Sequence, residues 1–221
     1  MDENSALAKS NASVPDVWRG IDSIIALEHI QRIAKVYCSA SHVPRDYQGQ
    51  AGFGNAIIAC SRALRLGVDA SDLMQNSYFI QGRLVLSTPF MIGIINSCGR
   101  FSPMRFVLTG EGDDMACYAT AKDLSDGELL KGPTITMAMA KAEGWLTKGG
   151  SKWRTMPEQM IRFRAASFWS RLYASDILLG MHTQEEAIDI EEVSVTAVSD
   201  LNAKVAQPAP EPEPADDGEL F

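Results

Sequence analysis

Residues 156–173 form the stretch that most constrains the fold, because their pattern predicts a long helix with three chemically distinct faces. Thr155 and Glu158 have the spacing of a capping box, and Pro157 falls in the first turn, where a missing N–H removes no hydrogen bond. A helix is therefore expected to begin near Met156. It can bury one face in a core and offer cations and aromatic rings on the other two.

The three faces follow from placing the residues at the angular step of an α-helix. One face is apolar, a second carries two guanidinium groups, and a third combines a guanidinium group with aromatic rings. In that order they hold Ile161, Ala165, Phe168 and Leu172; Met160, Arg164, Ser167 and Arg171; and Arg162, Trp169 and Tyr173.

The charge around this helix is opposite to that of the whole chain. Six Lys or Arg residues and one acid, Glu158, lie between residues 148 and 173, although the formal net charge is −8. Residues 1–175 hold 19 basic and 16 acidic side chains, whereas residues 176–221 hold 1 and 12. The acidic pI is therefore a poor guide to partners, because the acid lies mainly in the C-terminal part.

Two interpretations of this basic segment stay open from spacing alone. Its cations can be a solvated helix face with core aromatics beneath. Alternatively, they can follow the phosphates of single-stranded nucleic acid, with rings beside them for the bases. Arg62 and Arg65, on the outer side of another predicted helix, are either solvated charges or an extension of this surface. The candidate DNA-binding residues are Lys148, Lys152, Trp153, Arg154, Arg162, Arg164 and Arg171.

A family resemblance favours the nucleic-acid interpretation. The run MIRFRAASFWSRL, residues 160–172, resembles the C-terminal core motif of the RecT/Redβ family of phage single-strand annealing proteins. Residues 55–101 resemble that family's helix ending in Leu-Gly, its short hairpin and its helix ending in Gly. The motif match identifies Arg162, Arg164 and Arg171 as the family-equivalent cations.

The resemblance covers roughly residues 50–190 and implies a function. Such a protein coats single-stranded DNA as a homo-oligomer, a ring or a helical filament, and anneals complementary strands without ATP. It would serve phage homologous recombination and DNA repair in the cytoplasm of a bacterial host. A phage exonuclease or a host single-strand-binding protein would be a further partner.

Motifs for other chemistry are missing from the sequence. It contains no G-x-x-x-x-G-K-[ST] for ATP phosphates and no G-x-S-x-G nucleophile motif. The four cysteines form no C-x-x-C pair, and the carboxylates show no metal-ligand spacing. We therefore expect no catalytic residue, metal or cofactor. The alternative from another class is a phage-encoded interaction scaffold whose aromatic-basic helix docks a protein partner.

The expected fold is α+β, with a small antiparallel β-sheet packed against several helices in a RecT/Redβ-like annealing core. Residues 1–17 are expected to be disordered, residues 18–190 to form the annealing domain, and residues 191–221 to be an acidic, Pro/Glu-rich disordered tail. No stretch approaches the ~18 apolar residues of a membrane span. A soluble, cytoplasmic protein is expected.

Local signals place further elements. Periodicity and end signals predict helices over residues 18–39 and 53–66, the first capped by Asp22 or Ser23. Gln81-Gly82 is expected to turn a hairpin, and residues 100–121 to form two strands. Thr136 is expected to cap a short helix. Trp145 and Trp153 flank a basic loop, and Trp153 is expected to lie nearer the ligand groove.

Overall fold

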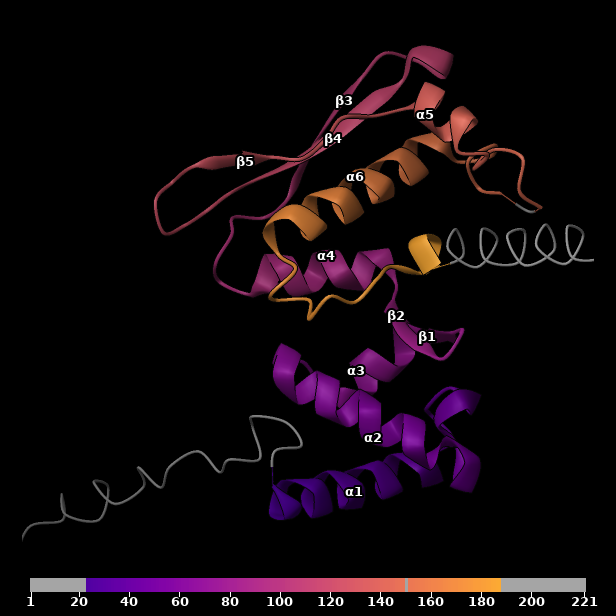
Figure 1. The fold of residues 1–221 in the computed structure, drawn as a ribbon, viewed down its shortest axis with the longest axis vertical. Coiled ribbons are helices and arrows are strands. Elements are labelled where there is room, and N and C mark those ends of the chain that lie inside the picture. The colour runs from indigo at the N-terminus through magenta and orange to yellow at the C-terminus, as the bar shows by residue number, and fades with distance from the viewer. Residues whose placement is uncertain (1–22, 150, 188–221) are drawn as a thin grey trace, which may run out of the picture.

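The computed structural model describes residues 23–149 and 151–187 and has a mixed α+β fold, which confirms the predicted class (Figure 1). The predicted disordered ends, residues 1–17 and 191–221, lie outside the described residues, as does the predicted cap Asp22. The first part holds α1 (Ile24–Ser39), a short 3-10 helix (Arg45–Tyr47), α2 (Gly49–Leu66), α3 (Ala70–Gln75), β1 (Ser77–Ile80) and β2 (Arg83–Leu86). The second part holds α4 (Thr88–Ser97), β3 (Arg105–Thr109), a 3-10 turn (Gly112–Asp114), β4 (Ala116–Lys122), β5 (Leu129–Lys131), β6 (Ile135–Thr136), α5 (Met137–Ala142) and α6 (Pro157–Tyr173).

The two parts lie one above the other in Figure 1, with the β1–β2 hairpin between them. The hairpin pairs Ser77 with Leu86, and its turn residues Gln81 and Gly82 have φ of 49° and 72°. Two positive φ values at the centre are typical of the turn that matches strand twist, so the predicted hairpin is confirmed. The Leu86 N–H donates to the His182 carbonyl at 3.0 Å and so joins the hairpin to the chain that follows α6.

The larger sheet is antiparallel, in the order β3-β4-β5, and β6 pairs with the other end of β4. Gly132 lies between β5 and β6 and donates to the Ala119 carbonyl at 2.9 Å. A Cβ added at Gly132 would lie 3.1 Å from the Cβ of Trp169, whose indole N–H donates to the Leu130 carbonyl at 3.0 Å. Because glycine at position 132 has no side chain, α6 can pack closely on the sheet.

Helix α6 is the centre of the second part, with the sheet on one side and α4 on the other (Figure 1). Ser170 donates to the Met91 sulfur of α4, and Trp169, on the sheet side, is fully buried. The prediction of one buried face and two open faces is therefore wrong, because two layers enclose the helix. Leu172, assigned to the apolar face, is 60% exposed.

The predicted capping box at the start of α6 is also wrong. Met156 is the N-cap and no side chain caps the helix, because the preceding residues form a turn that leaves Thr155 one position too early. Glu158 pairs instead with Arg162 one turn later. The Thr183 N–H donates to a Glu186 carboxylate oxygen at 3.0 Å, which is half of a capping box at the helical residues 184–187.

Other local predictions are confirmed. Ser23 caps α1 by accepting from the Ala26 N–H, and Thr136 caps α5 by accepting from the Met139 N–H. Gly67 ends α2 in the left-handed conformation. Helix α2 begins at Gly49, four residues before the predicted start at residue 53.

Candidate nucleic-acid interface

A cleft of two neighbouring hollows follows the segment after α6: the larger hollow lies between the two parts, where α2 and the hairpin meet this segment, and the smaller lies between this segment and α6. Its larger hollow has a volume of about 460 Å³ and the smaller about 260 Å³. We call the two hollows together the basic cleft, because both are lined by Gly180, Met181 and His182. The larger hollow is also lined by Ile58, Arg62, Phe79, Gly82, Arg83, Leu84 and Leu179; the smaller is also lined by Ser170, Arg171, Ser175 and Leu178.

Three guanidinium groups reach the basic cleft from separate elements. Arg62 comes from α2, Arg83 from β2 and Arg171 from α6. The lining contains no Asp or Glu. Within residues 23–149 and 151–187, Arg62 and Arg83 form no ion pair. The cleft therefore presents uncompensated positive charge to solvent, as an anion-binding surface requires.

Arg171 is held in place by Glu186. Its Nε lies 2.7 Å from Oε1 of Glu186, an ion pair without hydrogen-bond alignment, and the Glu186 side chain is only 7% exposed. The Arg171 guanidinium also contacts Nδ1 of His182. Arg171 is therefore a positioned donor with part of its charge balanced, whereas Arg62 and Arg83 supply net charge.

His182 is held towards its neutral form. Burial lowers the pKa of His182, and the positive charges of Arg171 and Arg83 lower it further, while the Glu186 carboxylate opposes them. Near neutral pH the imidazole is therefore a hydrogen-bonding group rather than a fourth cation. The chain beside it has unusual geometry, since Leu179 and Gly180 have φ of 54° and 68°. A positive φ at leucine is rare and tends to occur at functional sites.

A separate pocket, which we call the tryptophan pocket, lies at the start of α6 and has a volume of about 250 Å³. The rings of Trp145 and Trp153 are 5.1 Å apart, and the Arg164 guanidinium lies 4.0 Å from the Trp145 ring centre. This is a cation–π contact. Arg164 is 6% exposed and so is held inside the fold. The pocket is lined by Trp145, Lys148, Gly149, Ser151, Lys152, Trp153, Gln159, Met160, Phe163, Arg164, Gln184 and Glu185.

The structure divides most of the predicted site residues between the basic cleft and the tryptophan pocket. Lys148, Lys152, Trp153 and Arg164 come together at the tryptophan pocket, where Trp145 and Trp153 are both buried. Arg171 alone reaches the basic cleft.

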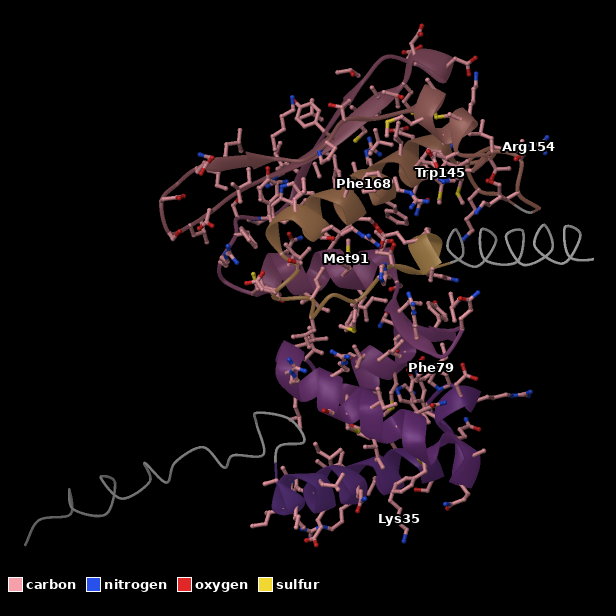
Figure 2. All side chains as sticks on the ribbon, in the orientation of Figure 1. Lys35, Phe79, Met91, Trp145, Arg154 and Phe168 are labelled. Carbon is pink, nitrogen blue, oxygen red and sulfur yellow. The ribbon has the colours of Figure 1, made fainter. Side chains whose placement is uncertain are left out.

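The other two predicted residues lie outside both linings. Arg154 is exposed at the edge of the molecule, as Figure 2 shows. Arg162 pairs with Glu158 on the surface of α6.

Sequence reasoning missed Arg83, Phe79 and His182 as cleft residues and left Arg62 undecided. The sequence places Arg62 on a helix, Arg83 after a hairpin turn and His182 in a polar stretch, with no shared motif. The only available signal was the outward position of Arg62 on its predicted helix.

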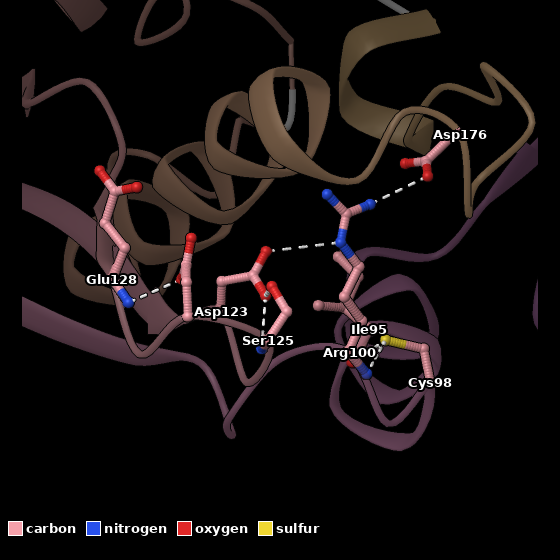
Figure 3. A network of polar contacts seen from close by, with 8 residues as sticks. Ile95, Cys98, Arg100, Asp123, Ser125, Glu128 and Asp176 are labelled. Atoms are coloured by element: carbon pink, nitrogen blue, oxygen red, sulfur yellow. Dashed lines mark hydrogen bonds and ion pairs between the residues drawn. The ribbon is translucent and has the colours of Figure 1, made fainter.

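A polar network around Arg100, after the end of α4, is structural. Arg100 lies 3.6 Å from Asp123 and 2.9 Å from Asp176, and so joins the end of α4 to two distant turns (Figure 3). The Ser125 hydroxyl and N–H lower the pKa of Asp123, and the Arg100 charge adds to this. Arg100 is thus already neutralised and is not a candidate for phosphate binding.

The part of the chain that the structure describes contains neither a cluster of metal ligands nor a membrane-spanning helix. No group of three or more His, Cys, Asp or Glu residues there could hold a metal ion. All four cysteines are free thiols, and Cys60 and Cys117 are buried. Among the described helices, none has both the length and the apolar character needed to cross a membrane.

Comparison with known proteins assigns no family or function to the chain, so a function can be inferred only from the chemistry of the basic cleft and the tryptophan pocket. No family model matches the chain, and no curated protein or solved structure matches it either.

Proposed function

We propose that this chain binds single-stranded DNA in the basic cleft and anneals complementary strands without hydrolysing a nucleotide. The observation that carries the proposal is the convergence of Arg62, Arg83 and Arg171 on a cleft whose lining has no carboxylate. Guanidinium groups at such a surface neutralise phosphates and release counterions, which supplies sequence-independent affinity.

The lining favours an unpaired strand over a duplex. Beside the cations lie the Phe79 ring and the apolar side chains of Ile58 and Met181. Unpaired bases can pack on rings and apolar side chains while the backbone contacts the cations. In a duplex the base faces are stacked on each other, so this apolar part of the cleft would have nothing to bind.

The resemblance to the RecT/Redβ family adds assembly and context to the proposal. Three cations form a modest site, and a homo-oligomer, ring or filament, would multiply it along one strand. Under the proposal, the chain acts in phage recombination and repair in the bacterial cytoplasm. An exonuclease or a single-strand-binding protein would be its protein partner, and it needs no catalytic residue.

The burial of α6 gives the scaffold alternative less support than the DNA-binding proposal. This alternative required the aromatic-basic helix to face solvent, but Trp169 is fully buried and Arg164 is nearly so. Helix α6 is mainly a core element, so a protein partner would find few of its rings. We therefore propose no second function.

Salt dependence of DNA binding tests the proposal. Three phosphate contacts on a single strand predict a slope of about −2 for log affinity against log salt, at ~0.7 per contact. An Arg62→Gln/Arg83→Gln variant should lower the slope to about −0.7. The matched control is Arg65→Gln/Arg105→Gln, which removes the same charge at two exposed positions outside the cleft lining.

The control variant is expected to keep the natural slope. The proposal is refuted if the natural chain does not bind a single strand at low salt. If the Arg62/Arg83 and Arg65/Arg105 variants lose the same affinity for DNA, the basic cleft is excluded as the binding site.

A further inference from the structure

We propose that the tryptophan pocket binds the acidic segment at residues 211–221 of this same chain. The sequence there is EPEPADDGELF, with five carboxylate side chains, no Lys or Arg, and a Leu-Phe pair. This proposal concerns a different hollow from the basic cleft and does not depend on DNA binding.

The tryptophan pocket is lined by aromatic rings and by cationic side chains. Trp145, Trp153 and Phe163 supply rings, and Lys148, Lys152 and Arg164 supply positive charge. The one carboxylate in the lining, Glu185, already accepts a hydrogen bond from the Thr88 hydroxyl at 2.7 Å. A ligand that fits this lining carries apolar side chains flanked by carboxylates.

The size of the pocket favours peptide side chains over a whole small molecule. Its volume of about 250 Å³ is below the ~300–1,000 Å³ typical of small-molecule sites. Lys152 at its rim is exposed and has no ion-pair partner within the described ranges. A Leu or Phe side chain can therefore fill the hollow while a neighbouring carboxylate pairs with Lys152.

The length of the connecting chain allows the acidic segment to reach the pocket. Gln184 and Glu185 line the pocket, and the described part ends two residues later, at Ala187. Residues 188–210 are the only connection, and a chain of that length can span up to ~75 Å at about 3.3 Å per residue. Tethering of this kind gives effective concentrations in the millimolar range, so even weak binding would fill the pocket.

The distribution of charge along the chain also favours the acidic segment as the occupant of the tryptophan pocket. Residues 188–221 hold nine acidic side chains and one basic side chain, whereas residues 1–187 hold 19 of each. A docked segment would also cover Lys148, Lys152 and Arg164, three of the side chains predicted to bind DNA.

Zero-length cross-linking of the full chain tests this proposal. A carbodiimide couples a lysine to a carboxylate only when the two are in contact, and peptide mass spectrometry then identifies the pair. Near 0.15 M salt, where charges beyond ~8 Å are screened, Lys152 should couple to carboxylates of residues 211–219. Lys35 is the control, since it is exposed on α1 at the opposite end of the molecule from Trp145 (Figure 2).

A Leu220→Ser/Phe221→Ser variant separates docking from plain charge attraction, because it keeps every lysine and every carboxylate. Loss of the apolar side chain that fills the pocket should lower the Lys152 coupling yield by about tenfold. The proposal is overturned if Lys152 and Lys35 couple equally, or if the variant couples as well as the natural chain. Neither outcome depends on whether the basic cleft binds DNA.

Discussion

Replacing Gly52 with alanine is expected to destabilise the protein, whereas the same change at Gly54 is expected to stabilise it. Both glycines lie within α2, two residues apart. A Cβ at Gly52 would lie 2.3 Å from the Tyr47 carbonyl carbon, about 1.1 Å short of ordinary van der Waals contact at 3.4 Å. A Cβ at Gly54 would meet no atom within 4 Å.

The magnitudes follow from these distances. Alanine is favoured over glycine inside a helix by about 1 kcal/mol, which is the full expected effect at Gly54. At Gly52 the clash is with backbone, so Tyr47 must move, and overpacking of this kind costs about 1–3 kcal/mol. Movement of Tyr47 also endangers its buried hydrogen bond to the Ser77 hydroxyl, worth about 1 kcal/mol. The net effect of Gly52→Ala is a loss of about 1–3 kcal/mol.

Urea denaturation followed by circular dichroism measures both variants against the natural chain. The free energy of unfolding should fall for Gly52→Ala and rise for Gly54→Ala, a difference of about 2–4 kcal/mol between them. If Gly52→Ala does not lower the free energy of unfolding, the close packing of α2 on the Arg45–Tyr47 turn is refuted.

Three further predictions concern packing, protonation and thiol exposure. Gly132→Ala should lower the free energy of unfolding by about 1–3 kcal/mol, because its Cβ would press on Trp169; an unchanged urea midpoint would contradict this. The pKa of His182 is lowered in the folded protein, so folding stability should fall as pH drops below the unfolded value of ~6.5, and a urea series over pH should show a smaller fall in His182→Gln. Burial raises the pKa of Cys60 to about 12, so maleimide near pH 8 should label the exposed Cys98 well before Cys60; comparable rates for these two thiols, followed by peptide mass spectrometry, would refute this.

Local signals in the sequence were sufficient for most of the elements. The Gln81-Gly82 turn, the Gly67 helix end and the Thr136 cap each depend on the conformation or hydrogen bond of one or two neighbouring residues. The predicted cap at Thr155 is wrong because the geometry of the preceding turn, which residue spacing does not reveal, decides which residue begins α6. The burial of Trp169 also needed the whole fold, since helical periodicity cannot tell that layers lie on both sides.

The candidate site was harder to predict because its residues are distant in sequence. Arg62, Arg83 and Arg171 line neighbouring hollows because the fold places α2 and the hairpin beside the chain after α6, which the Leu86–His182 hydrogen bond joins to the hairpin. No local pattern encodes that contact. The basic segment at residues 148–173 looked like one surface, yet its cations separate between a pocket, a cleft and the outer edge. Lys148, Lys152 and Arg154 lie in the turns before α6, and the helix points Arg162, Arg164 and Arg171 in different directions.

The most direct test of the central claim is strand annealing without ATP. Two complementary oligonucleotides, one of them labelled, are mixed at low salt with the natural chain, with Arg62→Gln/Arg83→Gln, or with Arg65→Gln/Arg105→Gln. The natural chain and the Arg65/Arg105 variant should accelerate annealing, and the Arg62/Arg83 variant should lose most of the acceleration while its circular dichroism is unchanged. If the natural chain gives no acceleration, or the Arg62/Arg83 variant anneals as fast, the basic cleft is not an annealing site.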